Sequence, residues 1–205
     1  MNGLYRLSVR PFNLTLFHSN SVRACLSPFM RPTYTPLASR HKMASPQSPG
    51  FIVYKPPFRP TVDKPSVILY GSIEQNVPLN WQTSLASSLS DLPVAILNPC
   101  RDDWDSTWVE DISFPKFKEQ VEWEMDHAKV ADVIVFYFAP HTLTPITLLE
   151  LGMYAGSGKA VVCCPPGFYK RGNVQIVCLR YGITLLESLE ELQGEVRRRL
   201  EEKTG

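Results

Sequence analysis

Glu150 is the residue whose surroundings best suit covalent chemistry. With histidine counted as neutral, it is the only charged residue between Asp132 and Lys159, and leucines flank it on both sides. An ionised carboxylate in such apolar surroundings is costly unless it is paired or hydrogen-bonded, and removal from water raises its pKa. A perturbed carboxylate in a cleft is a candidate for catalysis. The alternative is a glutamate on the one solvent-facing stripe of a helix, and periodicity alone favours neither interpretation.

The segment NPCRDDWD, residues 98–105, holds a second group of polar side chains directly after a predicted strand. Asp103 or Asp105 could donate a proton or bind a hydroxyl group, and Trp104 could stack on a planar base. Asn98, at the end of the strand, is a further candidate for ligand binding. The alternative is a solvated acidic loop that caps the following helix.

Four more residues are candidates for substrate binding. Gly71 and Ser72 follow an apolar run, and a glycine there permits a ligand to approach the backbone closely. They form neither a G-x-G-x-x-G fingerprint nor a P-loop, which argues against a dinucleotide or ATP. His141 lies on the segment that precedes the glutamate described above. Thr144, followed by proline, has the pattern of a helix N-cap.

Strands and helices alternate along the part of the chain that carries these residues. Apolar runs predict strands over residues 66–70, 93–97, 132–138, 159–164 and 183–186. The spacing of apolar residues predicts helices over 79–89, 115–130, 144–156, 173–181 and 188–203. This alternation predicts an α/β fold, a doubly wound, flavodoxin-like parallel sheet of about five strands with helices on both faces. Ligands of such sheets bind beyond the carboxyl ends of the strands, where the candidate residues fall.

The composition narrows the classes of function. The chain has 205 residues and a formal net charge of +1, so no bulk charge favours nucleic acid or an anionic membrane as partner. No apolar run approaches the roughly 18 residues that a membrane-spanning helix needs. The five cysteines show no C-x-x-C spacing, which favours free thiols over disulfides and gives no metal site.

The amino-terminal stretch differs in composition from the rest. No Asp or Glu precedes Asp63, whereas Arg, Ser and Pro are frequent there, as is typical of a mitochondrial transit peptide. The alternatives are a disordered leader, or a start at Met43 that leaves a cytoplasmic protein. We therefore divide the chain into a leader (1–50), a proline-rich extended lead-in over the domain surface (51–65) and one domain (66–205).

Six ordered segments resemble the nucleoside 2-deoxyribosyltransferase family. They are GSIE (71–74), WQ (81–82), NPCRDDWD (98–105), QVEWE (120–124), ADVIVFYF (131–138) and TPITLLELG (144–152). The resemblance covers about residues 66–183. It is closer to the less characterised branch of the family, which has a DWD loop and an S/T-P-I-T-L-L-E-L-G helix.

The resemblance implies a role for several residues. The nucleophilic glutamate of the family precedes Leu-Gly in the helix after the central strand, and Glu150 matches that position. The well-studied branch has an aspartate six residues earlier, where this chain has Thr144, so Asp103 or Asp105 is expected to supply the acid and base. Ser72 and the backbone near Gly71 are expected to hold the sugar or a 5′-phosphate.

The implied activity is a retaining transfer of the glycosyl group of a (deoxy)nucleoside through a covalent intermediate. The partner is a small-molecule nucleoside or nucleotide, no cofactor is needed, and a homo-oligomer is expected. If water is the acceptor, the same site is an N-glycosidase that acts on a nucleoside or its 5′-monophosphate. A non-catalytic nucleotide-binding module is the alternative from another class.

Overall fold

The computed structural model describes residues 49–73 and 80–204. The expected leader, and with it the mitochondrial and cytoplasmic alternatives that depend on Met43, lies almost entirely outside the described residues. No helix in the described part of the chain is long and apolar enough to cross a membrane.

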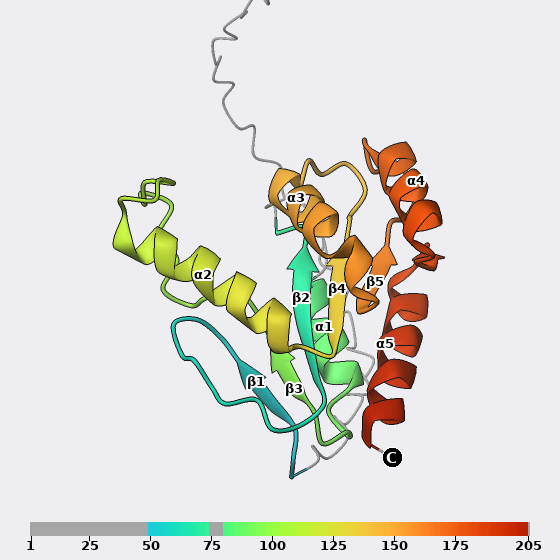
Figure 1. Cartoon of the computed structure of the whole chain (residues 1–205), viewed down its shortest axis with the longest axis horizontal. Coiled ribbons are helices and arrows are strands. Elements are labelled where there is room, and N and C mark those ends of the chain that lie inside the picture. The colour runs from blue at the N-terminus through green and yellow to red at the C-terminus, as the bar shows by residue number, and fades with distance from the viewer. Residues whose placement is uncertain (1–48, 74–79, 205) are drawn as a thin grey trace, which may run out of the picture. The chain divides into compact units, whose positions relative to one another are not determined.

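In the part of the chain that the structure describes, six parallel strands form a single sheet (Figure 1). They are β1 (Ile52–Tyr54), β2 (Ser66–Gly71), β3 (Ala95–Leu97), β4 (Val133–Tyr137), β5 (Ala160–Cys163) and β6 (Leu185–Leu186). Their order is β1-β3-β2-β4-β5-β6, and every neighbouring pair is parallel. Without β1, this is the flavodoxin-like order, so the predicted fold class is confirmed.

Among the described residues, five α-helices cover the two faces of the sheet (Figure 1). They are α1 (Trp81–Ser88), α2 (Pro115–Val130), α3 (Pro145–Tyr154), α4 (Arg171–Tyr181) and α5 (Leu189–Thr204), and a short 3-10 turn, η1 (Ala155–Ser157), follows α3. Alternate residues of β4 show the two faces. Ile134 and Phe136 pack in the core beneath α2, α3 and α4, whereas Val133 and Val135 pack beneath α1 and α5. The central strand is therefore apolar on both sides, as buried parallel strands are.

The sixth strand comes from the proline-rich lead-in, where the sequence predicted an extended segment over the surface and about five strands in all. Ile52 pairs with Ala95, and Tyr54 pairs with Leu97. The prolines of the lead-in follow this strand, and an edge strand needs ladder hydrogen bonds on one side only. Three proline-free residues are therefore enough to extend the sheet.

The switch point of the sheet lies at the carboxyl end of β2. The chain passes from β2 to β3 on one side and then to β4 on the other side of β2. The segments that follow β2, β3 and β4 consequently meet at one edge, and these segments carry the candidate residues.

The four cysteines in the described part of the chain are free thiols.

Candidate active site

Glu150 lies in the second turn of α3 and is half-buried. Burial raises the pKa of its carboxyl group to about 9, and the negative charge of Glu124 contributes to this increase. The isolated glutamate of the sequence therefore lies in a poorly hydrated position beside a second carboxyl group. A carboxyl group with a raised pKa in this setting can hold a proton at neutral pH, as catalytic acids and bases do.

Glu124 is the second member of this carboxyl pair, and it was not among the residues that the sequence predicted for the site. It lies on α2 and is half-buried. Burial raises the pKa of Glu124, and a hydrogen bond from Gln120 opposes this increase. The Nε2 atom of Gln120 donates to Glu124 Oε1 at 2.7 Å and to the carbonyl oxygen of Pro99 at 2.9 Å. Gln120 thus links the segment after β3 to the carboxyl pair.

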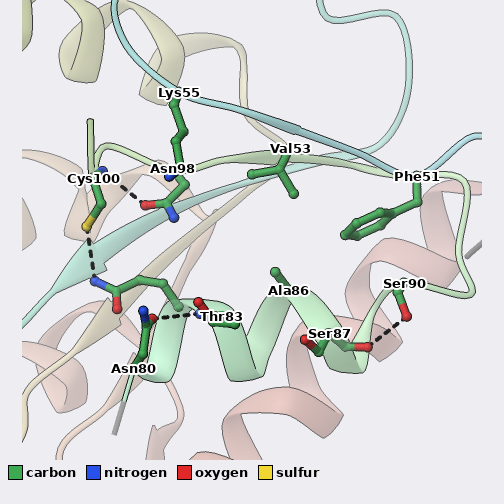
Figure 2. Close-up of a pocket in the computed structure, with 11 residues that line it drawn as sticks. Phe51, Val53, Lys55, Asn80, Thr83, Ala86, Ser87, Ser90, Asn98 and Cys100 are labelled. Atoms are coloured by element: carbon green, nitrogen blue, oxygen red, sulfur yellow. Dashed lines mark hydrogen bonds between the residues drawn. The ribbon is translucent and has the colours of Figure 1, made fainter. Parts of the chain in front are cut away.

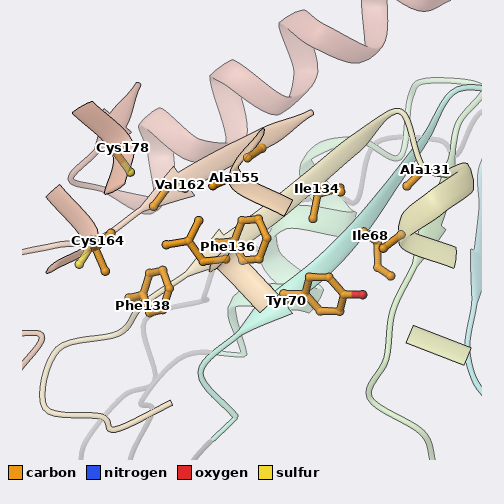
Figure 3. Close-up of a cluster of buried hydrophobic side chains, with 14 of the residues drawn as sticks. Ile68, Tyr70, Ala131, Ile134, Phe136, Phe138, Ala155, Val162, Cys164 and Cys178 are labelled. Carbon is orange, nitrogen blue, oxygen red and sulfur yellow. The ribbon is translucent and has the colours of Figure 1, made fainter. Parts of the chain in front are cut away.

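Two tyrosines border the pair. The hydroxyl of Tyr70, near the end of β2, donates to the carbonyl oxygen of Glu124 at 2.7 Å. Its ring stacks on the ring of Tyr154, one turn after Glu150, with centroids 6.1 Å apart. Burial raises the pKa of Tyr70, and the charge of Glu150 adds to this effect, so the phenol stays protonated. In Figure 3 the hydroxyl of Tyr70 points away from Phe136, with which its ring packs.

The segment before α3 is held by three buried hydroxyl groups. Ser72 Oγ lies 2.9 Å from Thr142 Oγ1 and 3.0 Å from Thr144 Oγ1, and the two threonine hydroxyls are 2.9 Å apart. The backbone N–H of Ala139 donates to Ser72 Oγ at 2.9 Å. His141 and Thr144 have φ angles of 62° and 46°, which non-glycine residues rarely adopt. The hydroxyl cluster stabilises this unusual backbone in front of the helix that carries Glu150.

Thr144 is the N-cap residue of α3 and proline follows it, as the sequence predicted, but its hydroxyl makes no capping hydrogen bond. Its backbone is left-handed, and its hydroxyl is engaged with Ser72 and Thr142 instead. Ser72 is only 1% exposed, so its side chain is part of the interior.

Gly71 has a structural reason to be glycine. A Cβ atom at this position would lie 2.6 Å from Trp81 Cζ2 and 2.6 Å from the carbonyl oxygen of Tyr137. Trp81 is fully buried, and its indole N–H donates to the carbonyl oxygen of Ser72 at 2.9 Å. The missing side chain therefore permits α1 and β4 to pack closely against the end of β2.

The charged residues of the loop after β3 pair with one another and with α2. Arg101, whose side chain is 2% exposed, donates to both carboxylate oxygens of Asp103 at 2.7 and 3.1 Å and also pairs with Glu119. The Arg101 hydrogen bond lowers the pKa of Asp103. Asp105 accepts hydrogen bonds from the backbone and side chain of Thr107, which lower its pKa. Both aspartates are exposed and favour the charged form, which suits an acid poorly.

The aromatic residues of the same loop pack against one another with tilted rings. The rings of Trp104 and Trp108 are 5.0 Å apart, and the guanidinium of Arg101 lies 4.8 Å from the centroid of Trp108. Trp104 is 47% exposed, which leaves one part of its surface available to a ligand. Arg101, the cation nearest to the predicted site in the sequence, is already engaged by two carboxylates and a ring.

Asn98 lines a groove between β1 and α1 (Figure 2). The groove has a volume of about 410 Å³, and neither Glu150 nor Glu124 lines it. The side-chain oxygen of Asn98 accepts a hydrogen bond from the backbone N–H of Cys100 at 3.0 Å.

His141 is exposed, and its backbone N–H donates to the carbonyl oxygen of Gly167 at 3.1 Å. Within residues 49–73 and 80–204, no cluster of three or more His, Cys, Asp or Glu side chains could hold a metal ion.

A signal for Glu124 exists in the sequence. Gln120, Trp123 and His127 form the buried stripe of α2, and Glu124 lies next to it at the helical spacing of four from Gln120 and Ala128. The electrostatic argument that applies to Glu150 also applies to a glutamate beside the buried stripe of a helix. The sequence alone does not single out Glu124, because α2 carries three other acidic residues. Their spacing does not reveal which of the four faces the sheet.

Comparison with known proteins supplies one family match. Residues 64–168 match the model of a family described as nucleoside 2-deoxyribosyltransferase like, which is just over half of the chain. The matched segment begins before β2 and ends after β5, so it includes the switch point and both Glu124 and Glu150. A comparison with curated proteins finds no match for the chain.

Proposed function

The chain belongs to the nucleoside 2-deoxyribosyltransferase-like family, and from this premise we propose that it is an N-glycosyl transferase acting on (deoxy)nucleosides through Glu150. One observation carries the proposal: Glu150 and Glu124, from two different helices, form a poorly hydrated and electrostatically coupled carboxyl pair. Double displacement at an anomeric carbon needs two carboxyl groups, one as nucleophile and one as acid and base.

The pair performs both roles when it holds one proton. Glu150, as the carboxylate, attacks C1′ of the deoxyribosyl group while the C1′–N bond to the base breaks. The departing nitrogen takes the bonding electron pair and receives the proton of Glu124. An acceptor base then loses its N–H proton to Glu124 and attacks C1′, which releases Glu150 as the carboxylate. The oxocarbenium-like transition state carries positive charge at C1′, and this charge favours ionisation of Glu150 over Glu124.

Glu124 is a better candidate for the acid than Asp103 or Asp105, the residues that the sequence predicted. A general acid is most effective when its pKa lies near the working pH. Burial raises the pKa of Glu124, whereas hydrogen bonds lower the pKa of Asp103 and of Asp105. In this proposal the loop that contains Trp104 contacts the base, and the two aspartates fold the loop.

Water as the acceptor would make the protein an N-glycosidase with the same two glutamates. A 5′-monophosphate substrate is less favoured, because Arg101 is neutralised by Asp103 and Glu119. A nucleotide-binding module without turnover does not need a coupled carboxyl pair. A transferase exchanges the base of a nucleoside, a hydrolase releases the base to water, and a binding module releases nothing.

The expected homo-oligomer is also part of the proposal. Ile146, Leu149 and Met153 on α3 are 61%, 62% and 47% exposed, and they flank Glu150 on its own helix. Apolar side chains grouped in this way favour association with another protein surface. Light scattering of the wild type and of a Leu149→Glu variant measures whether the chain associates through α3.

Chromatography of the bases released from a panel of deoxynucleosides and their 5′-monophosphates tests the activity. The assay uses the wild type, Glu150→Gln and Glu124→Gln, each with and without an acceptor base. Base exchange that Glu150→Gln abolishes and Glu124→Gln strongly reduces supports the transferase, and base release without an acceptor supports the hydrolase. A folded wild type that releases and exchanges no base excludes the proposed reaction for this panel.

A further inference from the structure

The lead-in that precedes β2 contacts α2 through a buried indole. Trp123 of α2 is fully buried, and its indole N–H donates to the backbone carbonyl oxygen of Phe58 at 2.7 Å. An indole has one N–H and no acceptor, so this hydrogen bond satisfies it completely. A shift of either partner would leave a buried donor unpaired, which costs free energy. The position of Trp123 in α2 is therefore tied to the position of the lead-in.

Apolar contacts surround this hydrogen bond. Tyr54, at the end of β1, and Val62 are partly buried and pack against the core cluster that includes Trp123. The ring of Tyr54 also lies 5.8 Å from the ring of Phe58. The ring of Trp123 stacks on the ring of His127, with centroids 4.0 Å apart. These contacts give the indole a defined orientation between the lead-in and its own helix.

Two ion pairs connect the same segment to α2 and to the loop after β3. Arg59 pairs with Asp126 of α2 at 2.8 Å, and Lys55 pairs with Asp102 of the loop. All four side chains are exposed, and exposed ion pairs contribute little to stability. The indole hydrogen bond and the apolar contacts are therefore the main anchors of α2 on the lead-in.

The anchored part of α2 is the part that carries the second carboxyl group, because Glu124 directly follows Trp123. In Figure 1 the segment between β1 and β2 runs beside α2. The hydroxyl of Tyr70 holds the same turn from β2, through the carbonyl oxygen of Glu124. The helix needs such anchors, because the charges of Glu150 and Glu124 repel each other and water would hydrate a carboxylate that moved outward.

The contacts of the lead-in come from outside the part of the chain that matches the family model. That match begins at residue 64, whereas β1 and Phe58 precede it. The family match therefore does not account for the anchoring of Trp123.

We propose that the lead-in is a clamp on α2 and that Trp123 is the positioning residue through which the clamp holds Glu124 beside Glu150. The inference rests on the proposed function for its catalytic meaning, because the two glutamates act there as a pair. Its physical content, the position of Glu124, is independent of any substrate.

The test compares the pKa of Glu150 with and without the indole N–H. Trp123→Phe keeps an aromatic ring and removes the donor. Carbon-13 NMR of carboxyl-labelled glutamate follows Glu150, whose signal is identified by its loss in Glu150→Gln. The proposal predicts that Trp123→Phe lowers this pKa from about 9 by about half a unit or more, because Glu124 moves away and its charge acts less strongly. An unchanged or higher pKa overturns the proposal.

The same comparison in a Glu124→Gln background separates the position of Glu124 from the hydration of Glu150. Without the second charge, Trp123→Phe should change the pKa of Glu150 by less than about 0.2. An equal decrease in both backgrounds overturns the proposal, since it means that the substitution only lets water reach Glu150.

Val196→Ala is the matched control for lost stability. Val196 is fully buried on α5 and packs in the core cluster on the opposite face of the sheet. The change should lower the unfolding temperature and leave the pKa of Glu150 within about 0.2 of the wild type. If Trp123→Phe does not fold, Tyr54→Ala loosens the clamp from the lead-in and should also lower the pKa of Glu150. An unchanged pKa in that variant overturns the proposal.

Activity gives a separate readout. In an active wild type, Trp123→Phe should reduce kcat about 5–50-fold, with KM within about threefold, and move the alkaline limb of kcat/KM to lower pH. In the Glu124→Gln background it should cause no further loss of kcat. An alkaline limb that stays in place in a slower variant contradicts the clamp. A wild type without turnover contradicts the proposed function, while the NMR titration still decides the position of Glu124.

Discussion

Glu150 on α3 and Glu124 on α2 lie close enough that the charge of Glu124 raises the pKa of Glu150. The two residues are 26 positions apart in the chain, and β4 connects their helices. The sheet brings them together because both helices pack on the same face, beneath which Tyr70 and Phe136 form the core. Each carboxyl group makes it harder for the other to ionise, so the pair favours holding a proton.

We predict that base exchange declines as pH rises through about 9. Above that pH the pair loses its shared proton, and the leaving base can no longer be protonated. Activity should also decline at low pH, where both carboxyl groups are protonated and no nucleophile remains. The measurement is kcat/KM from about pH 5 to about pH 10. In Glu124→Gln the residual rate should lose its alkaline decline, and persistence of that decline would point to another acid.

Replacement of Glu150 by Gln should stabilise the fold, increasingly as pH rises. In the unfolded chain this carboxyl ionises near its usual pKa of 4.5, whereas in the folded protein it keeps its proton up to about 9. Between these values the folded state binds more protons, so the free energy of unfolding falls as pH rises. Glutamine does not ionise and avoids this loss, which is roughly 1–3 kcal/mol at pH 8 after allowance for residual hydration.

Urea unfolding of the wild type and Glu150→Gln at about pH 5 and about pH 8 measures this effect. Glu122→Gln is the matched control, since Glu122 is an exposed member of α2 whose partner is Lys118. Its effect should be below about 0.5 kcal/mol at both pH values. A Glu150→Gln gain that is the same at the two pH values would contradict the raised pKa.

Asp103→Asn and Asp105→Asn should each keep base exchange within about threefold of the wild type, whereas Glu124→Gln should lose about 10²–10⁴-fold. Asp103→Asn should also lower stability, because the buried guanidinium of Arg101 then keeps Glu119 as its only carboxylate among the described residues. Rates are therefore compared well below the unfolding temperature of each variant. A loss in Asp103→Asn as large as that in Glu124→Gln would return the role of acid to the loop.

Gly71→Ala should destabilise the protein by about 1–3 kcal/mol, since the new methyl group meets the carbonyl oxygen of Tyr137 and the ring of Trp81 at 2.6 Å. Backbone on β4 cannot move aside without disturbing the ladder between β2 and β4. Gly194→Ala is the control, because Gly194 lies in α5 and a methyl group there would have nothing within 4 Å. That change should stabilise the helix by about 0.5–1 kcal/mol. Thermal unfolding of both variants separates the two effects, and equal stability of Gly71→Ala and the wild type would refute the steric argument.

The sequence predicted the fold well because the strands and helices have clear periodicity. Val133 to Tyr137 is apolar on both faces, and Trp81, Leu85 and Leu89 mark one buried stripe at spacings of four. Strand β1 was missed, because three residues between proline-rich segments have too short a pattern to distinguish a strand from a loop. Its pairing with β3 depends on contacts far apart in the sequence.

The candidate site could be derived from the sequence only in part, for a related reason. Glu150 was evident as a candidate because no other charge surrounds it in the sequence. The proximity of Glu124 depends on how α2 and α3 pack, and no local pattern specifies that. The conformation of Thr144 likewise depends on the hydroxyl of Ser72, 72 positions earlier. Thr144 is the N-cap residue that the sequence predicted, but the contact of its hydroxyl with Ser72, in place of a capping bond, could not be read from the local sequence.

Direct detection of a glycosyl-enzyme on Glu150 tests the account most closely. The wild type is mixed with a deoxynucleoside in the absence of an acceptor base and quenched in acid, and its intact mass and peptides are measured. The account predicts a mass increase of one deoxyribosyl group on the peptide that contains Glu150, absent from Glu150→Gln and lost from the wild type when an acceptor base is added. Base exchange that persists in Glu150→Gln, or an adduct on a different residue, would contradict it.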